Sequence, residues 1–408
     1  MKISVRKLFG RFDYDFELGN ITESGIAILT GPNGFGKTTI LECINAISNS
    51  DLLFFSDLKF ESFEVVKEET EERIYIQKLA DGLKINEIEI SDKDISFLSK
   101  GVINRRMAIR NNNAQGNFMF DRKYNNDSLS RVLNLMQKIF GKIQYVKEQR
   151  LNENEDGKIL TNRQSDGKSI YHKDLLRGVN SIPEKLIRRM QVLNFKYSQL
   201  SNALDSTFPK RLFNLQQGIT KEQFEQEMQQ MQEKIEKLHL NGISKIEKLD
   251  VTEFKVEDAR ALKVYFEDFN QKYQVYEEII EQLELFREIV NNRFRFKYLE
   301  ITAEQGMIVK DRDTGERIRL NSLSSGEQEI LILYYTLLFE TPEGMMVLID
   351  EPEISLHIAW QRMFAKDLKR IVQLKKIYTI LATHSPQMIF GNQNIQYDLG
   401  EMYKNGLN

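Results

Sequence analysis

The residues most clearly spaced for chemistry lie in the segment Gly31-Pro32-Asn33-Gly34-Phe35-Gly36-Lys37-Thr38, which has the phosphate-loop pattern. The apolar run 25–29 before it predicts a buried strand, and the run 39–44 after it predicts a helix. In such a loop, backbone N–H groups and the helix N-terminus bind phosphate oxygens, the lysine neutralises phosphate charge and the threonine hydroxyl serves Mg²⁺. A plain glycine turn before a helix is the simpler alternative. The expected nucleotide contacts are Gly31, Asn33, Gly34, Gly36, Lys37, Thr38 and Thr39.

Two adjacent acids, Asp350 and Glu351, follow the apolar run 345–349, which predicts a buried strand. A phosphate loop needs a carboxylate for Mg²⁺ and a group that handles water. We expect Asp350 to hold the metal through its water shell and Glu351 to polarise an attacking water. Acids at a strand end are often merely solvated, but an isolated apolar strand has no other reason to end in two of them.

Two further polar segments could contact phosphate groups. Ser324, Gly326 and Glu327 lie just before the helical run 330–333, where a serine hydroxyl, a backbone N–H and a helix N-terminus can bind an anion. A serine there is by itself more often only a helix start. His384 follows a predicted strand and could sense a terminal phosphate, although a lone histidine at a strand end is usually structural.

The elements that must position these residues alternate between strands and helices. Period-2 patterns and apolar runs predict strands over residues 3–5, 12–18 and 25–29, and Asp81-Gly82 predicts a hairpin between strands 73–77 and 83–88. Strands joined by a turn at 313–315 are expected at 306–309 and 317–320. Runs 345–349, 360–374 and 377–381 then alternate strand, helix and strand, as in an α/β layer.

The middle third of the chain is predicted to be helical. Apolar residues recur at alternating spacings of four and three through 186–204, 224–238 and 262–283, and Pro183 stands where a helix can start. Helices of this size span about 30 to 60 Å, so they form a short arm or pack back on the rest of the chain, and the pattern fits both equally.

Composition excludes several classes of protein. The 408 residues are 41% hydrophobic and 29% charged, which is typical of a folded chain of two to three domains, and the net charge of −3 leaves only a local patch for a polyanion. The single cysteine, Cys43, cannot form an internal disulfide, and no Cys or His cluster has zinc-ligand spacing. No apolar run is long enough to cross a bilayer, so we expect a cytoplasmic protein without membrane association.

Taken in this order, the segments 31–38, 323–327, 349–353 and 383–385 resemble the ABC-type ATPase heads of the SMC, RecF and OLD kind. The resemblance implies an α/β P-loop NTPase with a mixed sheet, flanking helices and an antiparallel β lobe, and a helical coiled-coil-like insertion. It divides the chain into an N-terminal lobe (1–150), the insertion (151–298) and a C-terminal lobe (299–408).

Roles follow from the resemblance residue by residue. Lys37 and Thr38 stand as Walker A, Asp350 as Walker B, Glu351 as the catalytic base and His384 as the switch histidine. Ser324, Gly326 and Glu327 stand in the signature loop, and residues 355–357 in the D-loop. The Q-loop glutamine, a metal contact near the catalytic water, is assigned to Gln149, with Gln144 nearby.

This family implies ATP and Mg²⁺ as cofactors, with Thr38, Asp350 and Gln149 on the metal. Because the signature loop completes the partner's site in such heads, a head-to-tail homodimer or higher oligomer is implied. Two departures are visible. Ser325 replaces a common glycine, and the arm has no Cys-x-x-Cys zinc hook.

Residues 350–356 look most like the standalone ATPases of bacterial anti-phage systems, such as PARIS AriA and Septu PtuA. Only 24 residues follow His384, so we expect no Toprim nuclease there, and Asp311 and Asp313 are better explained as solvated turn acids. We therefore expect an ATP-driven sensor and scaffold that controls a separate effector, a nuclease being the expected kind.

The alternative is a RecF- or SMC-like DNA-binding ATPase of repair or maintenance. Its support is two basic clusters, namely Arg105, Arg106 and Arg110, and Arg293, Arg295 and Lys297 interleaved with Phe294 and Phe296. Solvated loops and a strand face explain these clusters more simply in an acidic chain. A transporter subunit fits poorly because a heptad-like helical insertion separates Lys37 from Ser324.

Overall fold

A computed structural model describes residues 1–18, 24–67, 71–96, 127–147, 167–244, 253–302 and 304–405. The chain forms two compact units, one made of Met1–Arg150 with Thr341–Asn408 and one made of Leu151–Glu340. We call them the first and the second unit and describe each by itself. Residues 299–340, which the sequence assigned to the C-terminal lobe, group with the helical middle.

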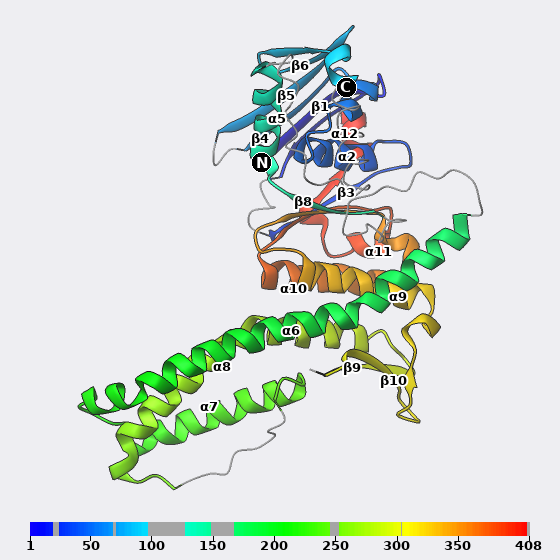
Figure 1. Cartoon of the computed structure of the whole chain (residues 1–408). Coiled ribbons are helices and arrows are strands. Elements are labelled where there is room, and N and C mark those ends of the chain that lie inside the picture. The colour runs from blue at the N-terminus through cyan, green and yellow to red at the C-terminus, as the bar shows by residue number, and fades with distance from the viewer. Residues whose placement is uncertain are drawn as a thin grey trace, which may run out of the picture. The chain divides into compact units, whose positions relative to one another are not determined.

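An antiparallel sheet of six strands, in the order β2-β1-β4-β5-β6-β7, occupies one part of the first unit (Figure 1). Strict alternation of buried and exposed residues in β2 places its three aromatic side chains on the core face. The predicted hairpin at Asp81 is confirmed, because Leu79 pairs with Gly82, but a turn at Asn86 divides the predicted strand 83–88. The strands are β1 (Lys2–Leu8), β2 (Phe12–Glu17), β4 (Ser62–Lys67), β5 (Glu72–Leu79), β6 (Gly82–Ile85) and β7 (Ile88–Ser91).

A five-stranded parallel sheet, in the order β14-β3-β13-β12-β8, forms the rest of the first unit's framework. All five residues of β3 are buried, as expected of a parallel strand covered on both faces. Because neighbours run in parallel, the carboxyl ends of β3, β12 and β13 lie at one edge of the sheet. The strands are β3 (Ile26–Thr30), β8 (Ile143–Val146), β12 (Met346–Asp350), β13 (Tyr378–Ala382) and β14 (Gln396–Asp398).

Helices of the first unit pack on these sheets. Buried side chains of α2 join one apolar core with residues of both sheets, and Cys43 lies in that core. These helices are α2 (Lys37–Ser48), α3 (Leu52–Asp57), α5 (Asp127–Phe140), α10 (Ile358–Lys375), α11 (Pro386–Ile389) and α12 (Leu399–Asn405), with 3₁₀ turns η4 (Pro352–Ser355) and η5 (Gln393–Ile395).

Three long helices, α6 (Gly167–Asn214), α7 (Lys221–Leu240) and α8 (Ala259–Asn291), dominate the second unit (Figure 1). The predicted heptad-like helices are confirmed, and α8 packs against both α6 and α7. The expectation that Pro183 starts a helix is wrong: Pro183 and Pro209 both lie inside α6. Tertiary packing of α6 stabilises a helix that an interior proline would otherwise weaken by about 3 kcal/mol.

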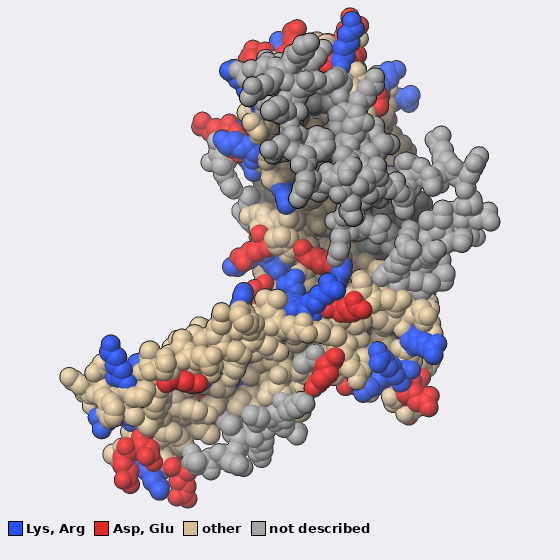
Figure 2. Space-filling model, viewed as in Figure 1, with Lys and Arg blue, Asp and Glu red and all other residues tan. Residues whose placement is uncertain are grey.

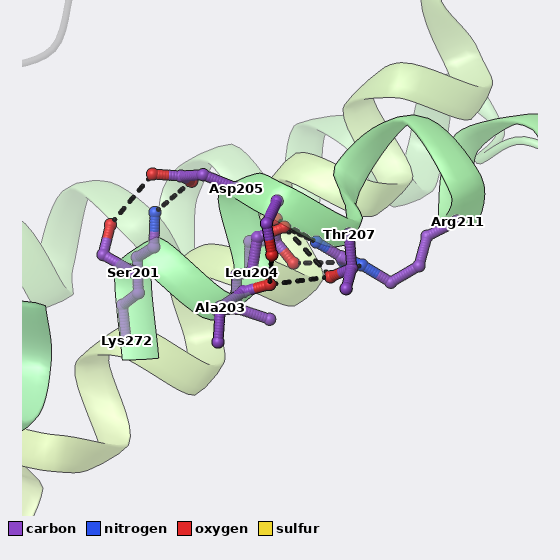
Figure 3. Close-up of polar contacts among 9 residues, drawn as sticks. Ser201, Ala203, Leu204, Asp205, Thr207, Arg211 and Lys272 are labelled. Carbon is purple, nitrogen blue, oxygen red and sulfur yellow. Dashed lines mark hydrogen bonds and ion pairs between the residues drawn. The ribbon is translucent and has the colours of Figure 1, made fainter. Parts of the chain in front are cut away.

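Polar contacts join α6 to α8 near the end of α6 (Figure 3). The two terminal guanidinium nitrogens of Arg211, Nη1 and Nη2, donate to the carboxylate of Asp268, which is 6% exposed, and Nη2 also donates to Leu204 O at 2.8 Å. Lys272 Nζ lies 3.2 Å from Asp205 Oδ1. Two cation–carboxylate pairs therefore link α6 to α8.

The remainder of the second unit is a small sheet with a helix. Strands β9 (Lys297–Thr302), β10 (Gly306–Asp311) and β11 (Arg317–Ile318) form an antiparallel sheet in the order β11-β10-β9, which confirms the predicted hairpin. Helix α9 (Ser325–Tyr335) continues into a π-helical turn at Thr336–Glu340, and 3₁₀ turns occupy Val256–Asp258 and Leu320–Ser322. In the described ranges, no helix is both long and apolar enough to cross a bilayer.

The predicted fold class is confirmed. The chain is α/β, with a mixed set of parallel and antiparallel sheets, flanking helices and a long helical insertion, and its phosphate-loop segment lies between strand β3 and helix α2. The sites at the ends of β3, β12 and β13 are therefore built on buried strands, which hold side chains more rigidly than loops do.

Candidate functional site

The loop from Gly31 to Gly36 joins β3 to α2, and its three glycines all have positive φ. Gly36 is left-handed (φ 90°) and precedes the first helical residue, Lys37. A Cβ at Gly36 would lie 2.6 Å from Leu8 Cδ2, so only glycine fits both the backbone and the packing. The tight turn therefore presents its backbone to the space before the N-terminus of α2, as a phosphate cradle requires. Asn33 and Gly34 are exposed, and Thr39 is half-buried in α2.

Phe35 fastens this loop to the antiparallel sheet. Its carbonyl oxygen accepts a hydrogen bond from Tyr14 Oη at 2.9 Å, and its ring packs against Phe12 and Tyr403. This role of Phe35 was not predicted from the sequence. The alternating aromatic residues of β2 are the signal that could have shown it, because they must cover something large on the core face.

Lys37 begins α2 and is 4% exposed. Its Nζ donates to Gly31 O at 3.1 Å and lies 2.5 Å from His384 Nε2. Burial lowers the Lys37 pKa from its ordinary value, while the negative charges of Glu351 and Asp350 oppose that effect. A buried cation among carboxylates is suited to receive a multiply charged phosphate.

Thr38 and Asp350 meet from α2 and the end of β12. The Thr38 hydroxyl donates to Asp350 Oδ1 at 3.1 Å, and Tyr145 Oη donates to Oδ2 at 3.3 Å. Asp350 is 7% exposed, and burial raises its pKa despite the hydrogen bond from Thr38. Tyr145, on β8, was not predicted as a site residue, and burial likewise raises its pKa.

This pair of oxygens fits Mg²⁺. Magnesium prefers hard oxygen ligands and usually binds through one or two protein groups with phosphate and water completing its shell. Across the described residues there is no cluster of three or more His, Cys, Asp or Glu side chains that could hold a metal ion. Thr38 and Asp350 are the residues that would hold it.

Glu351 leaves β12 in a left-handed conformation (φ 45°), unusual for a residue with a side chain. Its N–H donates to Ala382 O at 2.9 Å, which fastens it to the end of β13. Its Oε1 lies 2.9 Å from His384 Nε2. The strained turn brings the predicted water-handling acid and the predicted phosphate sensor together, and such strain persists where the surrounding structure holds it.

The segment that carries His384 is tied to the turn after Glu351. Glu353 accepts hydrogen bonds from the Thr383 hydroxyl at 2.7 Å and from His384 N–H. Gln361, on α10, accepts a hydrogen bond from the Ser385 hydroxyl at 2.7 Å. Glu353 and Gln361 were not predicted as site residues from the sequence. The second acid in Glu351-Pro352-Glu353 was the visible signal.

The predicted residues therefore fall into three groups. Lys37, Thr38, Asp350, Glu351 and His384 come together at one edge of the parallel sheet in the first unit. Gln149 lies outside the described residues, whereas Gln144 is part of β8. Ser324, Gly326 and Glu327 belong to the second unit.

Within the second unit, Ser324 caps α9. Its hydroxyl accepts from Glu327 N–H, and Glu327 Oε2 accepts from Ser324 N–H at 2.9 Å, which is a complete capping box. Lys297 Nζ lies 2.9 Å from both carboxylate oxygens of Glu327. The predicted signature serine thus has a fixed backbone at a helix N-terminus. In the segment expected to be the D-loop, His357 Nδ1 accepts from Ala359 N–H at the start of α10.

One basic cluster has internal partners. Arg293 is 5% exposed, donates to Tyr334 Oη at 2.9 Å and stacks over that ring, while Lys297 is paired with Glu327. Arg295 and the 64%-exposed Phe296 remain at the surface. On the face in Figure 2, basic and acidic side chains are interspersed among the described residues. Arg105, Arg106 and Arg110 lie outside those residues.

Solved structures with a related arrangement are distant. An Smc head domain with an extended coiled coil from Pyrococcus furiosus, bound to the C-terminal domain of ScpA, is 14% identical, with a TM-score of 0.38 over 95% of this chain and 90% of that one. The SMC head domain of Thermotoga maritima is 12% identical, with a TM-score of 0.34 over the same shares. No curated protein matches the chain.

The family itself is clear from the sequence. The model of the AAA ATPase domain family AAA_15 matches residues 7–389, which include the phosphate loop, the acid pair and His384. The chain belongs to this AAA ATPase domain family.

Proposed function

We propose that the chain binds ATP with Mg²⁺ and hydrolyses it to ADP and phosphate. The observation that carries this proposal is the convergence of three chain segments at the carboxyl ends of β3, β12 and β13. They bring together a buried lysine, an acid bonded to the threonine of the phosphate loop, and an acid in contact with a histidine. This is the set of groups that phosphoryl transfer to water requires.

Each side chain then has one task. The glycine-rich loop and Lys37 bind and neutralise the phosphates, and Thr38 and Asp350 hold the metal, with Gln149 as a further contact. When bound, Mg²⁺ neutralises charge that develops on the phosphate oxygens. Glu351 orients the attacking water and accepts its proton, and His384 donates a hydrogen bond to the terminal phosphate.

We further propose that a second copy of the chain completes the site in a head-to-tail homodimer or a higher oligomer. Ser324 and the Gly326 N–H, at the N-terminus of α9, supply hydrogen-bond donors and the positive end of a helix dipole. The capping box with Glu327 keeps this end rigid. A phosphate presented by the partner is the natural ligand of such a terminus.

Mixing two inactive variants tests this arrangement. Lys37→Ala disables the phosphate loop of its own chain and Ser324→Arg disables the signature of its own chain, so a mixed dimer regains one intact site. We expect each variant alone to be inactive and the mixture to recover turnover. The control is Ser198→Arg, on an exposed position of α6, which should stay active alone. A mixture as inactive as its components contradicts the shared site.

The proposed biological role is that of a sensor and scaffold in bacterial anti-phage defence, controlling a separate effector protein. Support for this role comes from the likeness of residues 350–356 to standalone defence ATPases. Tagged chain expressed from its native locus should retain a neighbouring gene product, and its release should depend on infection. A preparation free of any partner before and after infection counts against the role.

A DNA-binding ATPase of the RecF or SMC kind is the second candidate. The exposed pair of Arg295 and Phe296 is the observation that favours it, since arginine with a free aromatic ring can bind phosphate and stack a base. Stimulation of ATP turnover by duplex DNA, lost at high salt, would favour this function over the sensor.

A further inference from the structure

Glu353 lies in the 3₁₀ turn Pro352–Ser355, two residues after the predicted catalytic acid. One of its oxygens, Oε1, receives two hydrogen bonds from the segment that carries His384. The donors are the hydroxyl of Thr383, which is fully buried, at 2.7 Å, and the backbone N–H of His384 itself. Hydrogen bonds to a charged acceptor are about twice as strong as neutral ones, so this carboxylate is a firm anchor.

The other side of the same segment is held by Gln361. The hydroxyl of Ser385 donates to its Oε1 at 2.7 Å, and its Nε2 donates to Glu353 O at 3.1 Å and to Leu356 O at 3.0 Å. Gln361 therefore fastens the turn that carries Glu353 and the residue after His384 to one point on α10. Both neighbours of His384 are bound, directly or through Gln361, to the turn.

These anchors determine where the imidazole of His384 lies. Glu351 is fixed by its own N–H bond to Ala382 O, and His384 Nε2 reaches Glu351 Oε1 at 2.9 Å. The backbone of His384 has Glu353 as its side-chain acceptor. Loss of that acceptor leaves the N–H of His384 and the buried hydroxyl of Thr383 to find a new acceptor, which shifts the segment.

We propose that Glu353 is a positioning residue for the ATPase site, which holds His384 in contact with Glu351, and that Gln361 supports it. The proposal rests on the proposed function, because His384 and Glu351 are there the phosphate sensor and the water-handling acid. Glu353 acts through the two hydrogen bonds that Oε1 accepts and not through a proton or a metal. Its Oε2 is buried and has no hydrogen-bond partner in the described part of the chain.

Glutamine at position 353 separates positioning from chemistry. Its amide oxygen can accept the same two hydrogen bonds, but it has no charge, cannot take a proton at neutral pH and is a poor metal ligand. Glu353→Gln should keep most of the turnover, within about threefold. Glu353→Ala should lower kcat about 10- to 100-fold, the usual size for loss of a residue that orients a reacting group, with KM for ATP little changed.

Surface carboxylate Glu343, which pairs with Lys376 in the same unit, supplies the matched control. Glu343→Ala and Glu343→Gln should both leave kcat and KM unchanged. Thr383→Val removes the hydrogen bond to Glu353 Oε1 and the one that the same hydroxyl accepts from Ser385 N–H, but it keeps the carboxylate and its bond to His384 N–H. It should therefore show a smaller loss of kcat than Glu353→Ala. Equal loss in Glu353→Gln and Glu353→Ala would overturn the proposal and make the carboxylate itself chemically necessary.

A spectroscopic test needs no turnover. The chain has 4 histidines, so ring-labelled histidine gives a spectrum in which the loss of one signal in His384→Ala identifies His384. Glu353→Ala should move or broaden that signal and leave the other signals in place, and Glu353→Gln should restore it. An unmoved His384 signal in a folded Glu353→Ala protein overturns the inference. Absence of ATP turnover in the wild type would overturn only the proposed function.

Discussion

The Nε2 atom of His384 lies 2.5 Å from the ammonium nitrogen of Lys37. The same Nε2 lies 2.9 Å from a carboxylate oxygen of Glu351. A ring nitrogen either carries a proton and donates or carries a lone pair and accepts, so His384 cannot use Nε2 for both partners at once. A phosphate that draws Lys37 toward itself would release Nε2 for a hydrogen bond to the phosphate or to Glu351.

Replacing Lys37 should remove ATP turnover without lowering the stability of the folded chain. Burial lowers the Lys37 pKa, so the folded state holds the proton less tightly than the unfolded chain does. Below the pKa that Lys37 has in the folded state, its buried positive charge therefore lowers the free energy of unfolding. This destabilisation disappears as the pH rises above the pKa of lysine in the unfolded chain, near ~10.4. Lys37→Met should abolish ATP turnover but leave the Tm of the nucleotide-free protein equal or higher, by up to about 4 °C.

Thermal unfolding at pH 7 with and without Mg²⁺-ATP measures both effects. ATP should raise the Tm of the wild type and not that of Lys37→Met, because a ligand stabilises only the state that binds it. Lys376→Met is the control, since Lys376 lies at the surface in an ion pair with Glu343. A large fall in Tm for Lys37→Met would mean that its contacts with Gly31 and His384 outweigh the burial of its charge.

Asp350→Asn is also expected to raise stability while it lowers ATP turnover, in this case by removing a buried negative charge. Burial raises the Asp350 pKa, so its contribution to stability is greatest below the unfolded value near ~4 and is lost as the pH rises through the folded value. An amide can keep the contacts with Thr38 and Tyr145 without the charge. At pH 7 the variant should be more stable than the wild type, with a smaller difference near pH 4. ATP turnover should fall and should need a higher Mg²⁺ concentration to reach its maximum, because the metal has lost a carboxylate ligand. A variant less stable at pH 7 contradicts this assignment.

Most of the first unit could be predicted from the sequence because its signals are local. A phosphate-loop pattern, two buried apolar runs and an acid pair each identify an element within a few residues, and parallel pairing of β3, β12 and β13 brings their ends together. The side chains that orient the site were less visible. Tyr14, Tyr145 and Gln361 act through contacts between segments far apart in the chain, and no local pattern records such contacts.

Pro183 shows where local rules fail in the second unit. An isolated helix would break or start at a proline, but α6 packs against α8, α9 and β10, and this packing outweighs the local penalty. The explanation of the basic cluster at 293–297 as a solvated strand face was wrong for Arg293, which is buried, for a related reason. Whether an arginine binds a nucleic acid or a buried tyrosine depends on the fold around it, and Arg293 lies against Tyr334.

Glu351→Gln should lower ATP turnover about 10²-fold or more, because an amide cannot accept the proton of the attacking water. ATP binding should persist, since Lys37 and Asp350 are intact, and light scattering should show ATP-dependent dimers that decay more slowly than those of the wild type. Glu343→Gln, at the surface, serves as the control. ATP turnover of the wild type, measured with and without duplex DNA at two salt concentrations, also distinguishes a DNA-binding ATPase from a defence sensor. Full turnover in Glu351→Gln would exclude Glu351 as the catalytic base.

The Arg211–Asp268 pair predicts that substitutions of its two residues destabilise the helical unit to different extents. The side chain of Asp268 is 9% exposed and that of Arg211 is 29% exposed. Arg211→Ala leaves a buried carboxylate without its cation, which costs about 3 kcal/mol, whereas Asp268→Asn leaves an arginine that can still donate to Leu204 O and turn toward water. Urea unfolding followed by helical circular dichroism should therefore show a larger loss in the free energy of unfolding for Arg211→Ala than for Asp268→Asn.

Lys272→Ala is the control for this comparison. It removes the more exposed pair with Asp205 and should lower the free energy of unfolding by about 0.5 kcal/mol. Equal losses in all three variants would mean that apolar packing alone holds α6 against α8.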